Sequence, residues 1–168
     1  MQYKSRQHWE MDFEKRLNQY QKANEQGFPI SIKVGVYSGC FHNEHSPYAY
    51  QEIYDYMNNH DIDCGFEEHE SGPEVLAWRA IGTAGITLAK SVVDFITAII
   101  NARTKGRRKG DRASGNIRLI VRGYGNKGNL KEETILEIND FEEITSETIE
   151  KSITNALEKH YKAKRSEE

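Results

Sequence analysis

Apolar residues recur along this chain with two periods, one typical of helices and one typical of strands. Residues 3–25 carry an apolar stripe at spacings of four, four and three, formed by Trp9, Phe13, Leu17 and Tyr20. With charged residues between these positions, the stripe predicts an amphipathic helix. Over residues 30–37 every second residue is apolar, which predicts a strand buried on one face. Residues 48–59 predict a short helix, and residues 62–68 predict a second, weaker strand.

The longest apolar segment predicts a single long helix over residues 73–104. Pro73 suits the first turn of a helix, and the polar residues that follow fall on one narrow stripe. Nearly all other positions are apolar, so such a helix must be covered on almost every side. Gly82, Gly85 and Ala89 would share one side of it and let another backbone approach closely. We therefore expect self-association into a homo-oligomer, with these three residues at the interface.

Two short strands at residues 117–122 and 133–138, joined by a glycine-rich segment, predict a β-hairpin. Residues 146–162 predict a closing helix, and residues 163–168 a frayed polar tail. The expected order is α-β-α-β-α-β-β-α. The expected fold class is α+β, with a small mixed or antiparallel sheet of three to four strands packed on the long helix. We expect one domain over residues 1–162, with an N-terminal helix in 1–29, an acidic β-α-β region in 30–70 and the hairpin in 117–138.

Composition limits the class of protein. The chain has 168 residues, of which 37% are hydrophobic and 29% charged, with a net charge of -3. This length suits one domain, and the charge excludes a wholesale basic nucleic-acid binder. Two cysteines cannot build a disulfide-rich scaffold, and the N-terminal residues show no secretory signal pattern, so we expect a cytoplasmic protein.

Charge is unevenly distributed along the chain. Residues 101–122 contain eight Lys or Arg and a single acid, Asp111. Residues 34–78 hold nine acids and no Lys or Arg, and residues 123–150 hold eight acids and two Lys. The densest part is a basic patch formed by Arg103, Lys105, Arg107, Arg108, Lys109 and Arg112. It can complement the negative end of a helix and the acidic blocks, contact nucleic acid, or lie on anionic lipid. We expect the first, because no aromatic residue is interleaved in the patch for base stacking.

The apolar segment also has the length that crosses a bilayer. Arg79, Lys90 and Asp94 fall within it, and each charge is costly near the centre of a membrane helix. We therefore do not expect a lone spanning helix. A membrane-active effector that inserts the helix of residues 73–104 after a trigger stays open as an alternative.

Cysteine and histidine side chains concentrate within thirty residues, at Cys40, His42, His45, His60, Cys64 and His69. Thiolate and imidazole are suitable ligands for zinc. The cluster lacks the paired spacing of a strong zinc motif, so our leading expectation is a protein without a cofactor. The alternative is a metal-dependent enzyme or a metal sensor that uses these six residues, with zinc as the cofactor.

Four tyrosines mark the helix predicted at residues 48–59, and two of them, Tyr50 and Tyr54, fall on one face. Exposed tyrosines make good interface anchors, because they cover a large area at low entropic cost. We expect Tyr50 and Tyr54 to contribute to an interface with a protein partner.

Residues 50–160 resemble the bacterial effector-associated constant component family. The features that carry this resemblance are the Gly72-Pro73-Glu74 start, the small-residue-rich helix with its basic end, the hairpin and the closing helix. The resemblance implies a non-enzymatic adaptor encoded beside variable effectors, such as proteases or nucleotide-dependent ATPases, in bacterial conflict and antiviral systems. It supplies no catalytic residues, and residues 1–49 have no counterpart in it. We therefore expect a self-associating adaptor for a protein partner or effector.

Overall fold

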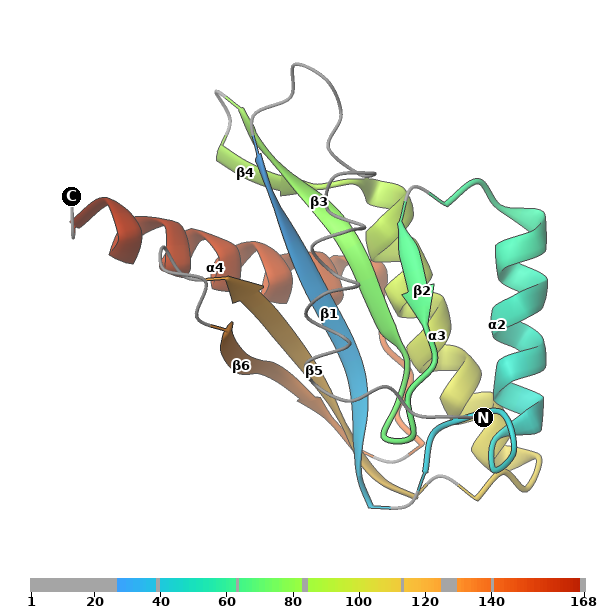
Figure 1. The fold of residues 1–168 in the computed structure, drawn as a ribbon. Helices are drawn as coiled ribbons and strands as arrows, with labels where there is room; N and C mark the ends of the chain where they lie inside the picture. Colours follow the sequence, from blue (N-terminus) through green and yellow to red (C-terminus); the bar gives the residue numbers. More distant parts are fainter. Residues whose placement is uncertain are drawn as a thin grey trace.

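The computed structural model describes residues 27–38, 40–62, 64–82, 85–112, 114–124, 130–139 and 141–166. Over these residues three helices and six strands follow one another in the order β-α-β-β-β-α-β-β-α (Figure 1). The elements are β1 (Gly27–Ser38), α2 (Pro47–Asn59), β2 (Gly65–Glu67), β3 (Glu74–Gly82), β4 (Gly85–Leu88), α3 (Lys90–Arg108), β5 (Ser114–Tyr124), β6 (Leu130–Ile138) and α4 (Ser146–Ser166). The expected α+β class is confirmed.

The sheet is antiparallel and has the order β2-β3-β1-β5-β6. The short strand β4 lies off this path and pairs with β3. Since β1 takes one edge of β3, the two short strands β2 and β4 share its other edge. The expectation of three to four strands was therefore too low.

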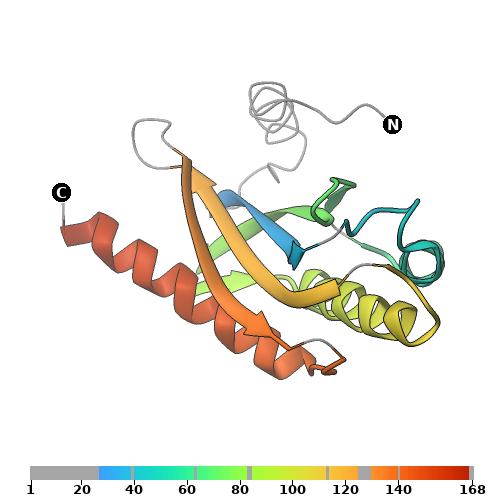
Figure 2. The same cartoon turned by 90° about the horizontal axis from the view of Figure 1, so that it is seen from below.

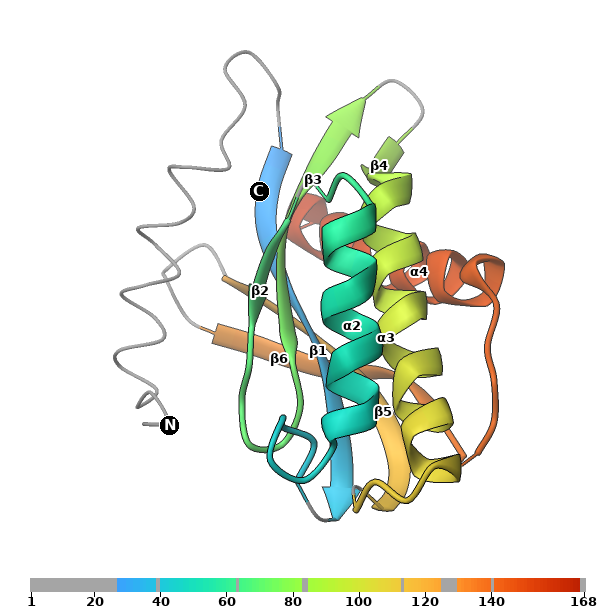
Figure 3. The ribbon, with the colours of Figure 1, turned by 90° about the vertical axis from the view of Figure 1, so that its right-hand side faces the viewer.

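All three helices lie on one face of the sheet (Figures 2 and 3). α2 and α3 lie side by side and run in opposite directions, whereas α4 crosses the sheet and packs against α3, β4 and β6. The apolar alternation of β1 turns its buried side chains toward these helices. They pack with apolar residues of β5 and with the aliphatic face of α3 in one core: Ile30, Ile32, Val34, Val36, Ile117, Leu119, Val121, Val92, Val93, Phe95, Ile96, Ile99 and Ile100.

The single long helix expected at residues 73–104 is wrong. Its first half forms the hairpin of β3 and β4, and the helix α3 begins only at Lys90. β3 pairs with β1 over seven residues, from Glu74 to Ala80. A continuous apolar run suits a buried strand as well as a helix, and each interior glycine weakens a helix by about 1 kcal/mol. Pairing with β1 therefore outweighs the helical spacing of the polar residues.

The expected small-residue interface is lost with that helix. Gly82 and Gly85 are paired across the end of the β3–β4 hairpin, and Ala89 is the residue that precedes α3. They do not share one side of a helix, so self-association through that helix no longer has a structural basis.

No helix among the described residues is long and apolar enough to cross a membrane. The membrane-active alternative required one helix over residues 73–104, and part of that segment is committed to the sheet. The helix on which that alternative depended is therefore not formed, and the alternative itself stays a prediction.

The other expected elements are confirmed: the strand at residues 30–37, the helix at 48–59, the hairpin and the closing helix. α4 continues to Ser166, so most of the expected frayed tail is helical. The N-terminal helix expected at residues 3–25 lies outside the described residues. The family resemblance rests on an order of elements, and the structure keeps this order for the basic end of α3, the hairpin and α4. It does not keep the long helix that the resemblance also includes. The resemblance itself stays a prediction.

Candidate docking surface and metal-ligand clusters

The basic stretch, residues 103–112, ends α3 and leads into β5, and much of it is bonded within the chain. The Arg103 side chain is fully buried, and its Nη2 donates to the Gly115 carbonyl at 2.6 Å. Arg108 Nη1 pairs with Glu143 Oε1 at 2.9 Å. The expected pairing of this basic segment with an acidic block is confirmed for Arg108, whereas Arg103 bonds to a backbone carbonyl instead. Arg103 in addition cannot belong to a surface patch, which corrects one member of the predicted set.

Asp111 links the end of this stretch to the start of α2. Its carboxylate is buried and accepts hydrogen bonds from the backbone N–H groups of Tyr48 at 3.2 Å and Ala49 at 2.9 Å. Ser46 precedes the helix but makes no side-chain cap, so Asp111 performs that role from 62 residues away. A Cβ at Gly106 would lie 2.1 Å from Asp111 Oδ2. Glycine at this position is therefore what allows the carboxylate to reach α2.

Two exposed aromatic side chains flank the end of α3, and with two cations they form what we call the docking surface: Tyr48, Arg107, Lys109 and Phe141. Tyr48 and Phe141 are each 47% exposed. The Arg107 guanidinium lies 5.4 Å from the centre of the Phe141 ring, and Lys109 Nζ lies 5.8 Å from the centre of the Tyr48 ring. Both distances suit cation–π contacts. Sequence reasoning missed this surface, because its aromatic residues come from segments far from the basic stretch.

The backbone of Phe141 is in the left-handed region, with φ of 67°. This conformation is uncommon for a bulky side chain and carries a free-energy cost. Arg108 Nη2 donates to the Phe141 carbonyl at 3.3 Å, and the Arg107 guanidinium makes a cation–π contact with the Phe141 ring. The chain thus stabilises an exposed aromatic residue in an unfavourable backbone conformation.

The structure brings three of the six predicted metal ligands together. The donor atoms of Cys40, His42 and His45 all lie within 4.8 Å of one another. His42 is buried and the other two are half-buried. Burial raises the pKa of the Cys40 thiol, and the Glu70 carboxylate, which accepts from Sγ at 3.7 Å, raises it further. A metal ion would therefore have to displace the thiol proton before binding there.

The other three predicted ligands do not join this cluster. The His60 ring stacks on Tyr56 with centroids 3.8 Å apart, and its Nδ1 donates to the Tyr56 carbonyl at 2.9 Å. Cys64 packs against the hydrophobic core. His69 lies in a second cluster instead. A single site made from all six residues is therefore wrong.

That second cluster consists of His69 and two acids that sequence reasoning did not select, Glu67 and Glu74. His69 Nε2 lies 3.4 Å from Glu67 Oε2 and 3.1 Å from Glu74 Oε2. Burial lowers the pKa of His69, but the two carboxylates outweigh it and raise the pKa above its ordinary value. The clusters lie on adjoining loops, since the Phe41 N–H donates to the Glu70 carbonyl at 2.9 Å.

The two tyrosines expected at an interface have different environments. Tyr50 is fully buried, and its hydroxyl donates to the Phe41 carbonyl at 3.0 Å. It is a core residue, and the prediction that it forms an interface is wrong. Tyr54 is 39% exposed, and its hydroxyl donates to Glu68 Oε2 at 3.2 Å.

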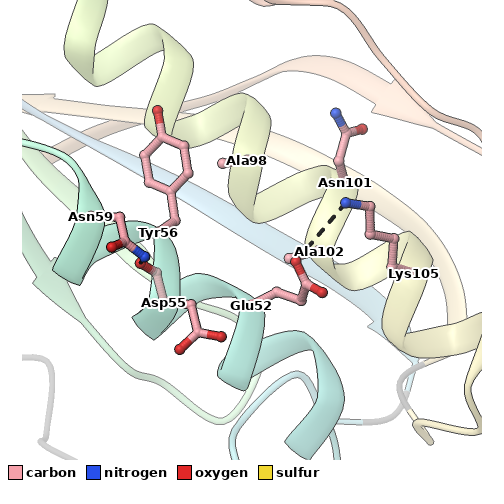
Figure 4. A pocket seen from close by; sticks show the side chains of 8 residues that line it. All are labelled: Glu52, Asp55, Tyr56, Asn59, Ala98, Asn101, Ala102 and Lys105. Atoms are coloured by element: carbon pink, nitrogen blue, oxygen red, sulfur yellow. Dashed lines mark hydrogen bonds and ion pairs between the residues drawn. The ribbon is translucent and has the colours of Figure 1, made fainter.

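α2 and α3 also border an open polar groove of about 280 Å³ (Figure 4). Lys105 Nζ lies 3.9 Å from Glu52 Oε2 across it, so Lys105, like Arg108, faces an acid of its own chain. The groove is lined by Glu52, Asp55, Tyr56, Asn59, Ala98, Asn101, Ala102 and Lys105. These residues show no arrangement of nucleophile and base that would support catalysis.

No protein-family model, curated protein or solved structure matches this chain. Its function is therefore inferred from the contacts described above. They contain a surface suited to recognition and two clusters of metal-ligating side chains.

Proposed function

We propose that this chain is a non-catalytic adaptor that binds an acidic segment of a partner protein on the docking surface. The observation that carries the proposal is the pairing of two exposed aromatic rings with two cations around the end of α3. Tyrosine and arginine are enriched among the residues that dominate binding energy at protein interfaces. Acidic side chains of a partner would meet Arg107 and Lys109, while its apolar groups would cover Tyr48 and Phe141.

A protein partner fits this surface better than nucleic acid does. Nucleic-acid affinity depends on several cations that neutralise successive phosphates. Arg103 is buried, and Arg108 and Lys105 each face an acid of the same chain. The net charge of -3 also opposes a long polyanion. A short acidic segment needs only the two cations beside the rings, Arg107 and Lys109. Arg107 also donates from Nη1 to the Asp111 carbonyl at 2.6 Å, which fixes its position next to Phe141.

A role in a bacterial effector-linked system follows from the family resemblance alone. We propose it as the setting in which such an adaptor would act. In that setting the acidic segment would belong to the effector.

The proposal is tested by fluorescence anisotropy with a dye-labelled acidic peptide that contains aromatic residues. A peptide of the same sequence with every acid replaced by its amide measures non-specific binding. We expect the acidic peptide to bind more tightly and its affinity to fall as salt is added. The Phe141→Ser and Lys109→Glu variants should each lose about tenfold or more in affinity.

Lys151→Glu is the matched control, because it makes the same charge change at an exposed position on α4. Equal losses in Lys109→Glu and Lys151→Glu would show that only net charge matters and would refute the docking surface. Tighter binding of a single-stranded oligonucleotide than of the acidic peptide would assign the surface to nucleic acid instead.

A second candidate function is supported by the cluster of Cys40, His42 and His45, and we propose it as a metal-sensing site for zinc. Two imidazoles and one thiolate leave a fourth position for another ligand. Zinc should bind the chelator-treated protein and release protons, and Cys40→Ser should weaken binding about tenfold or more. Unchanged affinity in Cys40→Ser would exclude this site.

A further inference from the structure

The pairing of β2 with β3 places two carboxylates directly opposite each other. Glu67 is the register partner of Glu74. Side chains alternate along a strand, and their neighbours Phe66 and Val75 pack with the core on the helix side. Both acids therefore point to the opposite face of the sheet. Like charges in this cross-strand position destabilise a sheet.

Both acids are also removed from water. Glu74 is fully buried, and Glu67 is 9% exposed. Burial of a carboxylate is costly unless a cation or hydrogen bonds compensate for it. The ligand atoms of Glu67, His69 and Glu74 all lie within 4.8 Å of one another, so the two buried acids and the imidazole form a set that can hold a cation.

The spacing around His69 matches that of ligands around one metal ion. Ions held at about 2.1 Å by each ligand separate neighbouring ligand atoms by about 3.0 Å in octahedral geometry and about 3.4 Å in tetrahedral geometry. The distances of 3.1 Å and 3.4 Å from His69 Nε2 to the two carboxylates fall at these values. A single Nε2–H group, in contrast, can point well at only one of two oxygens.

One of these ligands is oriented by a further hydrogen bond. The hydroxyl of Ser31, which is fully buried on β1, donates to Glu74 Oε1. This leaves Oε2 of the same carboxylate facing His69. Hydrogen bonds of this kind from outside the ligand set commonly orient carboxylate ligands in metal sites.

We propose that Glu67, His69 and Glu74 bind a divalent first-row transition-metal ion. Two carboxylate oxygens and one imidazole nitrogen suit Mn²⁺ and Zn²⁺, and water would complete the coordination. The His69 side chain is 17% exposed, which gives the ion a route from solvent. This site shares no residue with the docking surface or with the Cys40, His42 and His45 cluster.

Lys33 is the neighbouring cation that competes with a metal ion for these acids. It is the register partner of Glu74 on β1, and its charge lowers the pKa of His69. In the absence of metal, the imidazole faces both acids, and Lys33 lies beside Glu74 in the strand register. Water fills the coordination positions that remain when the ion binds.

The test is metal titration of the full chain in a Cys40→Ser background, which removes the only thiolate of the other cluster. Mn²⁺ is the first probe because it prefers oxygen ligands to sulfur, and Zn²⁺ is the second. We expect one ion per chain. Glu67→Gln and His69→Asn should each lower the affinity about tenfold to a hundredfold, and Ser31→Ala about tenfold.

Glu70→Gln is the matched control, because Glu70 is an exposed acid in the same loop. Equal affinities in Glu67→Gln and Glu70→Gln would overturn the proposal. Thermal unfolding of the Cys40→Ser protein with and without Mn²⁺ gives a measurement that needs no variant of the site. Selective binding to the folded state should raise Tm, and no rise with either ion would also overturn the proposal.

Failure of this site leaves the adaptor proposal unaffected. The anisotropy test varies Phe141 and Lys109, and the metal titration varies Glu67, His69 and Ser31. Each variant set should leave the other measurement unchanged.

Discussion

The basic stretch of residues 103–112 and the acidic segment of residues 67–74 give opposite results from similar sequence signals. Each is a local concentration of one charge sign. In the basic stretch, the cations reach out to carbonyls and acids of other elements, as Arg103 and Arg108 do. In the acidic segment, two carboxylates are buried opposite each other around one imidazole. The first arrangement stabilises the fold, whereas the second is better suited to holding a cation.

The largest expected effect separates structural from surface cations within the basic stretch. Arg103→Ala should lower the free energy of unfolding by about 3 kcal/mol, because it empties a fully buried position and leaves the Gly115 carbonyl without this donor. Arg108→Ala should cost less than about 0.5 kcal/mol, because the Arg108–Glu143 pair is half exposed. Urea denaturation of both variants measures the difference. Equal losses of unfolding free energy in the two variants would show that burial does not distinguish structural from surface cations in this stretch.

A smaller effect is expected at the single acid of the basic stretch. Asp111→Ala should lower the free energy of unfolding by about 1–2 kcal/mol, because the N–H groups of Tyr48 and Ala49 lose their acceptor. The loss should be accompanied by faster amide exchange in the first turn of α2. Asp55→Ala, at an exposed position on the same helix, is the control, and we expect it to leave that exchange unchanged.

The smallest effect concerns an exposed ion pair outside both regions. The hydrogen bond from Lys90 at 2.8 Å holds the pKa of Asp94 below its ordinary value. A lowered carboxyl pKa contributes stability above the unfolded-state pKa and loses it as the pH falls through the folded-state pKa. Asp94→Asn should therefore lower Tm slightly at pH 7, and the difference should shrink as the pH falls below the ordinary carboxyl pKa. A constant difference across this range would assign the effect to packing instead.

Elements in which apolar residues repeat at a regular spacing could be predicted from the sequence. Elements whose structure depends on pairing with a distant strand could not. The alternation in β1 and the stripe of α4 come from local patterns that the fold preserves. Residues 74–88 are apolar enough for a helix or a buried strand, and only the partner strand β1 decides between them.

The candidate sites show the same limit. Proximity in sequence identified Cys40, His42 and His45, which lie on one loop. Glu67 and Glu74 meet through strand register, and Tyr48 and Phe141 meet the basic stretch through the tertiary fold. One sequence feature could have indicated the second cluster. Glu67 and His69 are two residues apart, and this spacing places both side chains on one face of an extended segment.

The cap that Asp111 supplies to α2 also affects the order of folding. The two hydrogen bonds close loops of 63 and 62 residues, and a contact of such long range forms late, after local structure. During synthesis, the first turn of α2 lacks these acceptors until the chain beyond α3 has left the ribosome. Chains that end before residue 111 should therefore expose an incomplete α2 to proteases, and the earlier half of the fold depends on the later half for its final stability.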